Sequence, residues 1–220
     1  MKKNILSQIN SPADLKNLNS DALDNLSGEV ANHIKRVIEE HGGHYSSPLG
    51  VVDLSIALHY VYDSPKDKII WDVGHQAYAH KILTGRRDQF HTLRQKDGIS
   101  GFLKRSESKH DIVGAGHAST SISSALGFAH ARDKDKTDDQ IVSIIGDGAM
   151  TGGLAYEGIN NLGYHKTQMT IVLNDNSMSI SESVGALSRY LNRVVTNPTY
   201  NRIRNDIWDL SGKIPMSSFV

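Results

Sequence analysis

Short apolar runs alternate with helix-like segments along the central part of the chain, and each run stops at glycine or asparagine. The runs are residues 69–73, 112–113, 141–145 and 169–173, and the helix-like segments between them are residues 77–83, 119–131 and 154–162. Strands that are apolar on both faces and separated by helices are typical of a parallel sheet buried between helices. The pattern predicts an α/β fold with a parallel sheet and helices on both faces.

The remaining segments predict three parts of the chain. Residues 1–40 carry leucine, isoleucine and valine at helical spacing and form an N-terminal helical segment. The sheet and its ligand site occupy residues 41–185, including a helix over 49–61. Residues 186–220 read as a weakly determined helix and a tail. Within the central part, the mixed-charge stretch 132–140 is expected to be a solvated loop.

Composition excludes several classes of protein. The chain has 24 basic and 24 acidic side chains, so it lacks the positive charge excess of a dedicated nucleic-acid binder. It has no cysteine, which excludes disulfides, thiolate metal sites and cysteine nucleophiles. No apolar stretch has the length of a signal core or a membrane span, so we expect a soluble cytoplasmic protein with no membrane partner.

Two polar triplets follow consecutive predicted strands. Gly146-Asp147-Gly148 and Asn174-Asp175-Asn176 are each an ordinary turn sequence when taken alone, but 25 residues lie between them, enough for one crossover helix. Parallel strands bring their carboxyl ends to one sheet edge, where ligands bind in open α/β sheets. Asp147, Asn176 and a backbone carbonyl of the turn after Asn176 form a hard-oxygen set suited to Mg²⁺ and a phosphate-bearing ligand. The adjacent glycines allow backbone amides to approach an anion.

Three other sites are disfavoured. A zinc site is disfavoured because the sequence has no histidine pair at helical i, i+4 spacing with a glutamate between. The stretch 114–119 imitates a dinucleotide fingerprint but lacks its final glycine. A Mg²⁺-dependent phosphohydrolase is disfavoured because no aspartate nucleophile opens the first predicted strand. Most histidines are expected to be surface or core residues: His33, His59, His91, His110, His130 and His165. For His41 and His80 the sequence does not decide between such a residue and a ligand.

The paired triplets resemble the thiamine-diphosphate motif of transketolase-like enzymes. Further blocks narrow the resemblance: Gly42-Gly43-His44, the stretches 71–78, 80–87 and 116–121, and residues 174–181. In this order they are similar to the N-terminal part of the 1-deoxy-D-xylulose-5-phosphate synthase family, from about residue 10 to about residue 190. The resemblance implies the thiamine-diphosphate-binding fold.

The resemblance also implies roles for residues at matching positions. The predicted Mg²⁺ ligands are Asp147, Asn176 and the carbonyl of Met178. The predicted contacts to thiamine diphosphate are His75, Gly116, His117, Ala118, Gly148, Ala149 and Asn176. His75 would lie near the reactive carbon of the cofactor, and His44 would face the substrate and assist proton transfer. Ala118 stands where the family often has serine, so a hydroxyl contact to the diphosphate is in question there.

The implied reaction is the condensation of pyruvate with D-glyceraldehyde 3-phosphate to 1-deoxy-D-xylulose 5-phosphate and CO₂, in isoprenoid and thiamine biosynthesis, by a homodimer. The 220 residues correspond to about a third of such an enzyme. The pyrimidine-binding domain, with the glutamate that activates the aminopyrimidine ring, and the C-terminal domain are absent. We therefore expect this chain alone to be nearly inactive. The alternatives are a non-catalytic module that binds thiamine diphosphate and Mg²⁺, or a truncated inactive fragment; intact His44 and His75 favour the enzyme.

Overall fold

The computed structural model describes residues 4–175 and Arg202. Residues 4–175 lie in one compact unit of the chain. The predicted site residues Asn176 and Met178 and the predicted helix and tail over 186–220 fall outside the described residues, Arg202 excepted. Across the part that is described, no helix combines the length and the apolar character needed to cross a membrane.

Three parallel strands form the sheet of the described part. They are β1 (Lys68–Trp71), β2 (Ile141–Gly146) and β3 (Thr170–Asn174), in the order β1-β2-β3. Both pairings are parallel, and Gly146 at the end of β2 lies opposite Asn174 at the end of β3. The first five residues of β2 are all buried, because this strand is central and both of its faces are covered. The prediction of a parallel sheet is confirmed.

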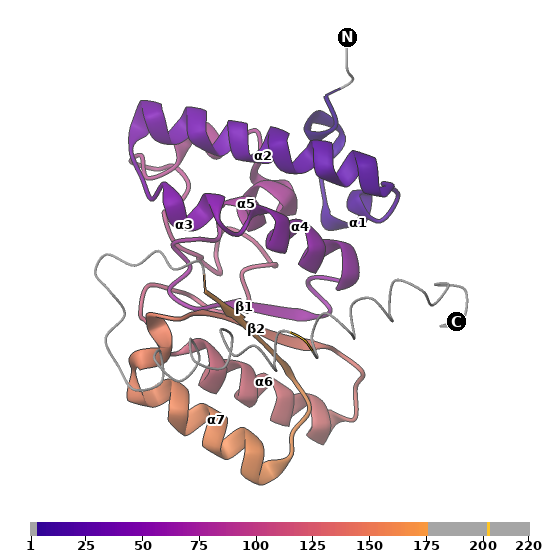
Figure 1. The fold of residues 1–220 in the computed structure, drawn as a ribbon, viewed down its shortest axis with the longest axis vertical. Helices are drawn as coiled ribbons and strands as arrows, with labels where there is room; N and C mark the ends of the chain where they lie inside the picture. The colour runs from indigo at the N-terminus through magenta and orange to yellow at the C-terminus, as the bar shows by residue number, and fades with distance from the viewer. Residues whose placement is uncertain (1–3, 176–201, 203–220) are drawn as a thin grey trace. The chain divides into compact units, whose positions relative to one another are not determined.

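Helices cover both faces of this sheet (Figure 1). They are α1 (Pro12–Leu15), α2 (Ser20–His41), α3 (Ser46–Leu49), α4 (Val52–Val61), α5 (Tyr78–Lys81), α6 (Ser121–Asp135) and α7 (Gly153–His165). Short turns supplement them: η1 (Leu6–Gln8), η2 (Ile82–Arg86), η3 (Phe90–Thr92) and η4 (Ala149–Thr151). On one face Leu58 of α4 packs with Trp71 and Ile144 of the sheet. On the other face Ala125 of α6 packs with Ile70.

The N-terminal helices form a second apolar cluster that rests on α4 and α5. In α2 the buried residues Leu26, Val30 and Ile34 recur at helical spacing and face this cluster. The helix begins where the Asn19 side chain accepts a hydrogen bond from the backbone N–H of Ala22, a standard N-cap. It ends at Gly42, which has φ +75°. Helices α1 and α2 therefore account for most of residues 12–41.

The predicted strand at residues 112–113 is wrong. These residues belong to a loop without regular structure that runs from the region of Leu103 to α6. Backbone and side-chain hydrogen bonds hold this loop, including Ala115 N–H to the carbonyl of Leu103. Two apolar residues before a glycine-rich stretch are too short a signal to distinguish a strand from a loop with buried contacts.

The predicted loop over residues 132–140 is wrong in its first part. Helix α6 continues to Asp135 and ends at Lys136, which adopts the left-handed conformation at φ +56°. A charged sequence can form the exposed end of a helix as easily as a loop, so composition did not locate the boundary.

Helices α6 and α7 approach closely at Gly158, so a larger residue at this position should destabilise the fold. An added Cβ at Gly158 would lie 2.9 Å from Ile122 Cγ2 and 3.1 Å from the backbone nitrogen of Ser123. We expect Gly158→Ala to lower the free energy of unfolding by about 1–3 kcal/mol, because α7 must shift from α6. Urea unfolding of the chain measures this change.

Gly163→Ala is the matched control in the same helix. An added Cβ at Gly163 meets nothing within 4 Å. This substitution should leave stability unchanged or raise it by up to about 1 kcal/mol, because alanine favours helix over glycine. Equal losses in the two variants would contradict the close approach at Gly158.

Candidate functional site

Asp147 lies where the carboxyl ends of β2 and β3 meet. Its backbone N–H donates to the carbonyl of Asn174 at 3.3 Å, which continues the pairing of the two strands past Gly146. The predicted juxtaposition of the two triplets at one sheet edge is therefore observed as far as Asn174. Asn176 and the Met178 carbonyl lie beyond the described residues.

The backbone at Gly116 and at Gly148, which follows Asp147, borders open space that an anion could occupy. An added Cβ at Gly116 or Gly148 would meet nothing within 4 Å, and Gly116, His117 and Ala118 are exposed. Asp147 supplies a hard carboxylate oxygen at the same edge, the type of ligand that Mg²⁺ prefers. These residues fit a magnesium ion with a diphosphate group.

Ser119 joins the two segments predicted to contact the diphosphate. Its side-chain hydroxyl donates to the carbonyl of Ala149 at 2.6 Å. Residues 116–118 directly precede Ser119, and Gly148 directly precedes Ala149. The structure therefore brings together the loop before α6 and the turn after β2, which are far apart in sequence.

His44 and His75 form a ring pair beside an aromatic wall. Their ring centroids are 5.1 Å apart in an edge arrangement, and the Phe102 ring lies 6.1 Å from His44. The hydroxyl oxygen of Tyr78 accepts a hydrogen bond from the backbone N–H of His44 at 3.4 Å. The structure thus brings together two residues that are 31 positions apart.

Burial keeps both rings of this pair neutral at neutral pH. It lowers the pKa of His44, with a further contribution from the positive charge of Arg94. It also lowers the pKa of His75, and His44 adds to the effect. The Nδ1 atom of His75 is buried and has no hydrogen-bond partner among the described residues. A neutral imidazole with a free ring nitrogen can accept a proton or a hydrogen bond from a bound ligand.

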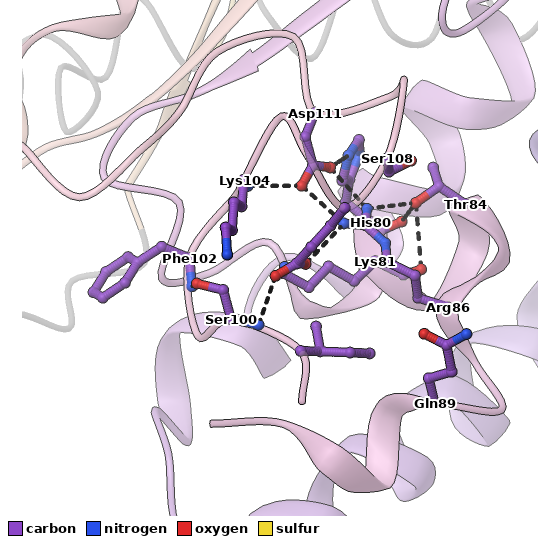
Figure 2. A network of polar contacts seen from close by, with 12 residues as sticks. His80, Lys81, Thr84, Arg86, Gln89, Ser100, Phe102, Lys104, Ser108 and Asp111 are labelled. Atoms are coloured by element: carbon purple, nitrogen blue, oxygen red, sulfur yellow. Dashed lines mark hydrogen bonds and ion pairs between the residues drawn. The ribbon is translucent and has the colours of Figure 1, made fainter. Parts of the chain in front are cut away.

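A buried network of charges that the sequence analysis missed joins α5 and η2 to the loop after Ser100 (Figure 2). Arg86 makes a two-pronged ion pair with Asp111, at 2.8 and 2.7 Å. Lys81 donates to Glu107 at 2.6 Å, and its side chain is fully buried. Burial alone raises the pKa of Asp111, but hydrogen bonds from His80 and Arg86 and the positive charge of Arg86 outweigh it and hold this pKa well below the usual range.

His59 and His80 extend the network through two hydrogen bonds whose donors and acceptors can be assigned. His80 Nε2 lies 3.2 Å from a carboxylate oxygen of Asp111, and His80 Nδ1 lies 2.9 Å from His59 Nε2. Burial lowers the pKa of both rings, so both are neutral. Because a carboxylate only accepts, His80 donates from Nε2 and accepts at Nδ1, and His59 donates to it. The open question about His80 is answered in favour of a buried core residue, and His59 is one as predicted.

The network holds the loop that carries Phe102. Glu107 accepts a hydrogen bond from the backbone N–H of Ser100 at 2.7 Å, and Asp111 accepts one from that of Lys104 at 2.9 Å. Glu107 thus binds Lys81 with Oε2 and loop backbone with Oε1. Asp111 binds Arg86 with both carboxylate oxygens, and its Oδ2 also accepts the backbone N–H of Lys104 (Figure 2). This arrangement sets the position of Phe102 against His44.

A sequence signal for this network existed in the stretch 77–86. It carries His80, Lys81 and Arg86 within an otherwise apolar helical run, and three basic groups on such a run require buried acidic partners. The partners Glu107 and Asp111 lie in a polar loop whose sequence shows no periodicity, so pairing them needed the fold.

Comparison with known proteins gives one family. A family model described as 1-deoxy-D-xylulose-5-phosphate synthase matches residues 6–218. The chain is 55% identical over 212 residues to a 1-deoxy-D-xylulose-5-phosphate synthase of Halothermothrix orenii, covering 96% of this chain and 33% of the relative. It is 54% identical over 211 residues to the enzyme of the same name from Caldanaerobacter subterraneus, covering 96% and 34%.

A solved structure shows the same fold. A transketolase from Campylobacter jejuni superposes with a TM-score of 0.68 at 22% identity, covering 76% of this chain and 30% of that one. The prediction of a thiamine-diphosphate-binding α/β fold is confirmed at the level of the fold. The chain spans about a third of the length of the curated relatives it matches.

The buried ion pair gives the second prediction. Arg86→Ala leaves the carboxylate of Asp111 buried without its main cation, which should lower the free energy of unfolding by about 3–5 kcal/mol. Lys66→Ala is the control, since Lys66 pairs with Asp138 on the surface, where loss of an ion pair should hardly change stability. Chemical unfolding of both variants measures the difference, and similar small losses would show that the buried pair contributes little.

The buried ring of His110 should make the stability of the chain sensitive to acid. Burial, with the positive charges of Lys109 and Arg86, lowers the pKa of His110 from 6.5 to about 4. Between these values the unfolded chain binds a proton that the folded chain does not, so the free energy of unfolding falls as pH falls through this window. We expect His110→Gln to make stability less dependent on pH between 6.5 and 4.

The control for this experiment is His91→Gln, which changes an exposed histidine. Urea midpoints at several pH values from 7.5 to about 4 compare the slopes. A His110→Gln slope equal to that of the wild type would refute the assignment.

Proposed function

Because the chain belongs to the 1-deoxy-D-xylulose-5-phosphate synthase family, we propose that it supplies the diphosphate-binding part of a thiamine-diphosphate-dependent transferase. The complete enzyme would condense pyruvate with D-glyceraldehyde 3-phosphate to 1-deoxy-D-xylulose 5-phosphate and CO₂. The observation that supports this most directly is the sheet edge at which Asp147 lies beside the end of β3 and Ser119 binds Ala149.

The residues at this edge would hold Mg²⁺ and the cofactor's diphosphate. Asp147 is the proposed metal ligand, joined by Asn176 and the Met178 carbonyl. Backbone groups of the exposed loop and turn would contact the diphosphate: Gly116, His117, Ala118, Gly148 and Ala149. When bound, thiamine diphosphate supplies the electron sink for the reaction.

His44 and His75 would manage protons next to the cofactor. Both are neutral near pH 7 because burial lowers their pKa values, so either can accept a proton from a bound substrate. His75, with an unpartnered buried Nδ1 among the described residues, would contact the cofactor, and His44 would face the substrate. A module that only binds the diphosphate would not need His44, which supports the enzyme over that alternative.

The chain alone should catalyse poorly. It spans about a third of its relatives' length, and the proposed activity requires a pyrimidine-binding domain and a C-terminal domain as well. We further propose a cytoplasmic homodimer for the complete enzyme, with small-molecule substrates and no nucleic-acid or membrane partner.

Cofactor binding is the fourth prediction and the test of this proposal. We expect the chain to bind thiamine diphosphate only when Mg²⁺ is present, and Asp147→Ala to weaken this binding about tenfold or more through loss of a charged ligand. Calorimetric titration with and without Mg²⁺ measures both effects.

Asp138→Ala serves as the matched control. Asp138 is an exposed carboxylate just before the amino end of β2, whereas Asp147 follows the carboxyl end of the same strand. It should bind as the wild type does. Folded wild-type chain that takes up no cofactor, or an Asp147→Ala variant that binds normally, would count against the proposed site. Pyruvate-dependent CO₂ release on adding a pyrimidine-binding domain and a C-terminal domain would then distinguish an enzyme from a non-catalytic module.

A further inference from the structure

We propose that Asp72 is a positioning residue that sets the two diphosphate-binding segments against each other. This inference rests on the proposed function, because it concerns the same site. The role belongs to a buried carboxylate that is not among the residues proposed to contact the cofactor or the substrate.

Asp72 is held firmly by the sheet. It follows the last residue of β1, is 1% exposed, and its backbone N–H donates to the carbonyl of Ile144 in β2 at 2.8 Å. Its own carbonyl accepts a hydrogen bond from the side-chain amide of Gln76 at 2.9 Å, next to His75. The side chain therefore projects from a fixed point of the scaffold.

The carboxylate binds the backbone of the loop before α6. One oxygen accepts from the N–H of Ser119 at 2.8 Å, and the other accepts from the N–H of Ser121 at 3.0 Å. Both hydrogen bonds are buried, where a carboxylate that accepts backbone N–H groups binds more strongly than at the surface. They fix the residue that directly follows the exposed stretch 116–118.

Ser119 passes this constraint to the turn after β2. Its φ of +70° is unusual for a residue with a side chain, and such a conformation persists only where surrounding contacts hold it. From this position its hydroxyl reaches the carbonyl of Ala149. Two successive hydrogen bonds thus connect Asp72 to both segments proposed to contact the diphosphate.

Close packing prevents Ser119 from finding another position. A Cβ added at Gly152 would lie 2.1 Å from the Ser119 hydroxyl oxygen and 2.8 Å from its Cβ. The start of α7 therefore requires glycine at this point and confines the serine side chain. Without the Asp72 carboxylate, no hydrogen bond would connect Ser119 to β1, and the exposed residues 116–118 would be less ordered. Part of the free energy of cofactor binding would then be spent on ordering them.

The chain contains a matched carboxylate at the other end of β1. Asp67 is 7% exposed and accepts backbone N–H groups of Gln140 and Asp63, at 2.8 and 2.7 Å. It makes the same kind of contact as Asp72 but at the amino end of the strand, away from the Asp147 edge. Asp67→Asn therefore reproduces the general cost of such a change without the positional effect.

The experiment compares Asp72→Asn with Asp67→Asn in titrations with thiamine diphosphate and Mg²⁺, at a temperature where both variants are folded. In asparagine the amide group can serve only one of the two N–H donors. We expect Asp72→Asn to raise the Kd for the cofactor about 10- to 100-fold, the range for lost supporting contacts around a metal site. Asp67→Asn should stay within about twofold, although both variants unfold more easily.

A second readout does not depend on the cofactor. Hydrogen exchange at the Ser119 and Ser121 amides should accelerate in Asp72→Asn and remain as in the wild type in Asp67→Asn. If Asp72→Asn is unstable, Ser119→Ala replaces it, since it removes the bond to Ala149 but keeps the Asp72 contacts and should also weaken binding.

The outcomes separate this inference from the proposed function. Wild-type binding with equal Kd changes in both aspartate variants, or no change in Asp72→Asn, would overturn the positioning role alone. Folded wild-type protein that takes up no cofactor would overturn the proposed function, and the inference with it.

Discussion

The parallel pairing of β2 with two neighbours determines where chemistry can occur in this chain. Because β2 is buried along its first five residues and pairs with β1 and β3 in the same direction, all three strands deliver their carboxyl ends to one edge. The residues after each strand must then meet there. Asp72 follows β1 and Asp147 follows β2, while Asn174 ends β3. The site is thus a consequence of strand direction before any side chain is considered.

Buried charges organise the loops at this edge. The loop between Leu103 and α6 contains little regular structure, so apolar packing alone cannot hold it. Asp111 and Glu107 bind both basic side chains and loop backbone, while Asp72 binds the backbone at the start of α6. Every such carboxylate must have its hydrogen bonds satisfied, because an unpaired charge in the interior is very costly. This requirement leaves few alternative loop conformations and favours a preorganised site.

The sequence predicted what periodicity and strand order control. Apolar runs located β1, β2 and β3, and the crossover spacing placed Asp147 beside the end of β3. It failed where tertiary contacts decide the local structure, as in the loop at residues 112–113 and the extension of α6 to Asp135. The ion pair between Arg86 and Asp111 joins residues 25 positions apart, and a charge pattern cannot reveal such a partner. The residue roles taken from the family remain predictions, since only binding and activity measurements test them.

Acid acts on function and on folding through the same physical cause. Burial lowers the pKa of His44 and His75 in the candidate site and that of His59, His80 and His110 in the core. The proton-transfer role proposed for His44 and His75 needs neutral rings, and the core needs them because an unpaired imidazolium is poorly solvated there. A fall in pH therefore removes the proton acceptors and lowers the free energy of unfolding together. A pH profile of activity would not separate these effects, so assigning a proton-transfer role to His44 requires stability to be measured at each pH.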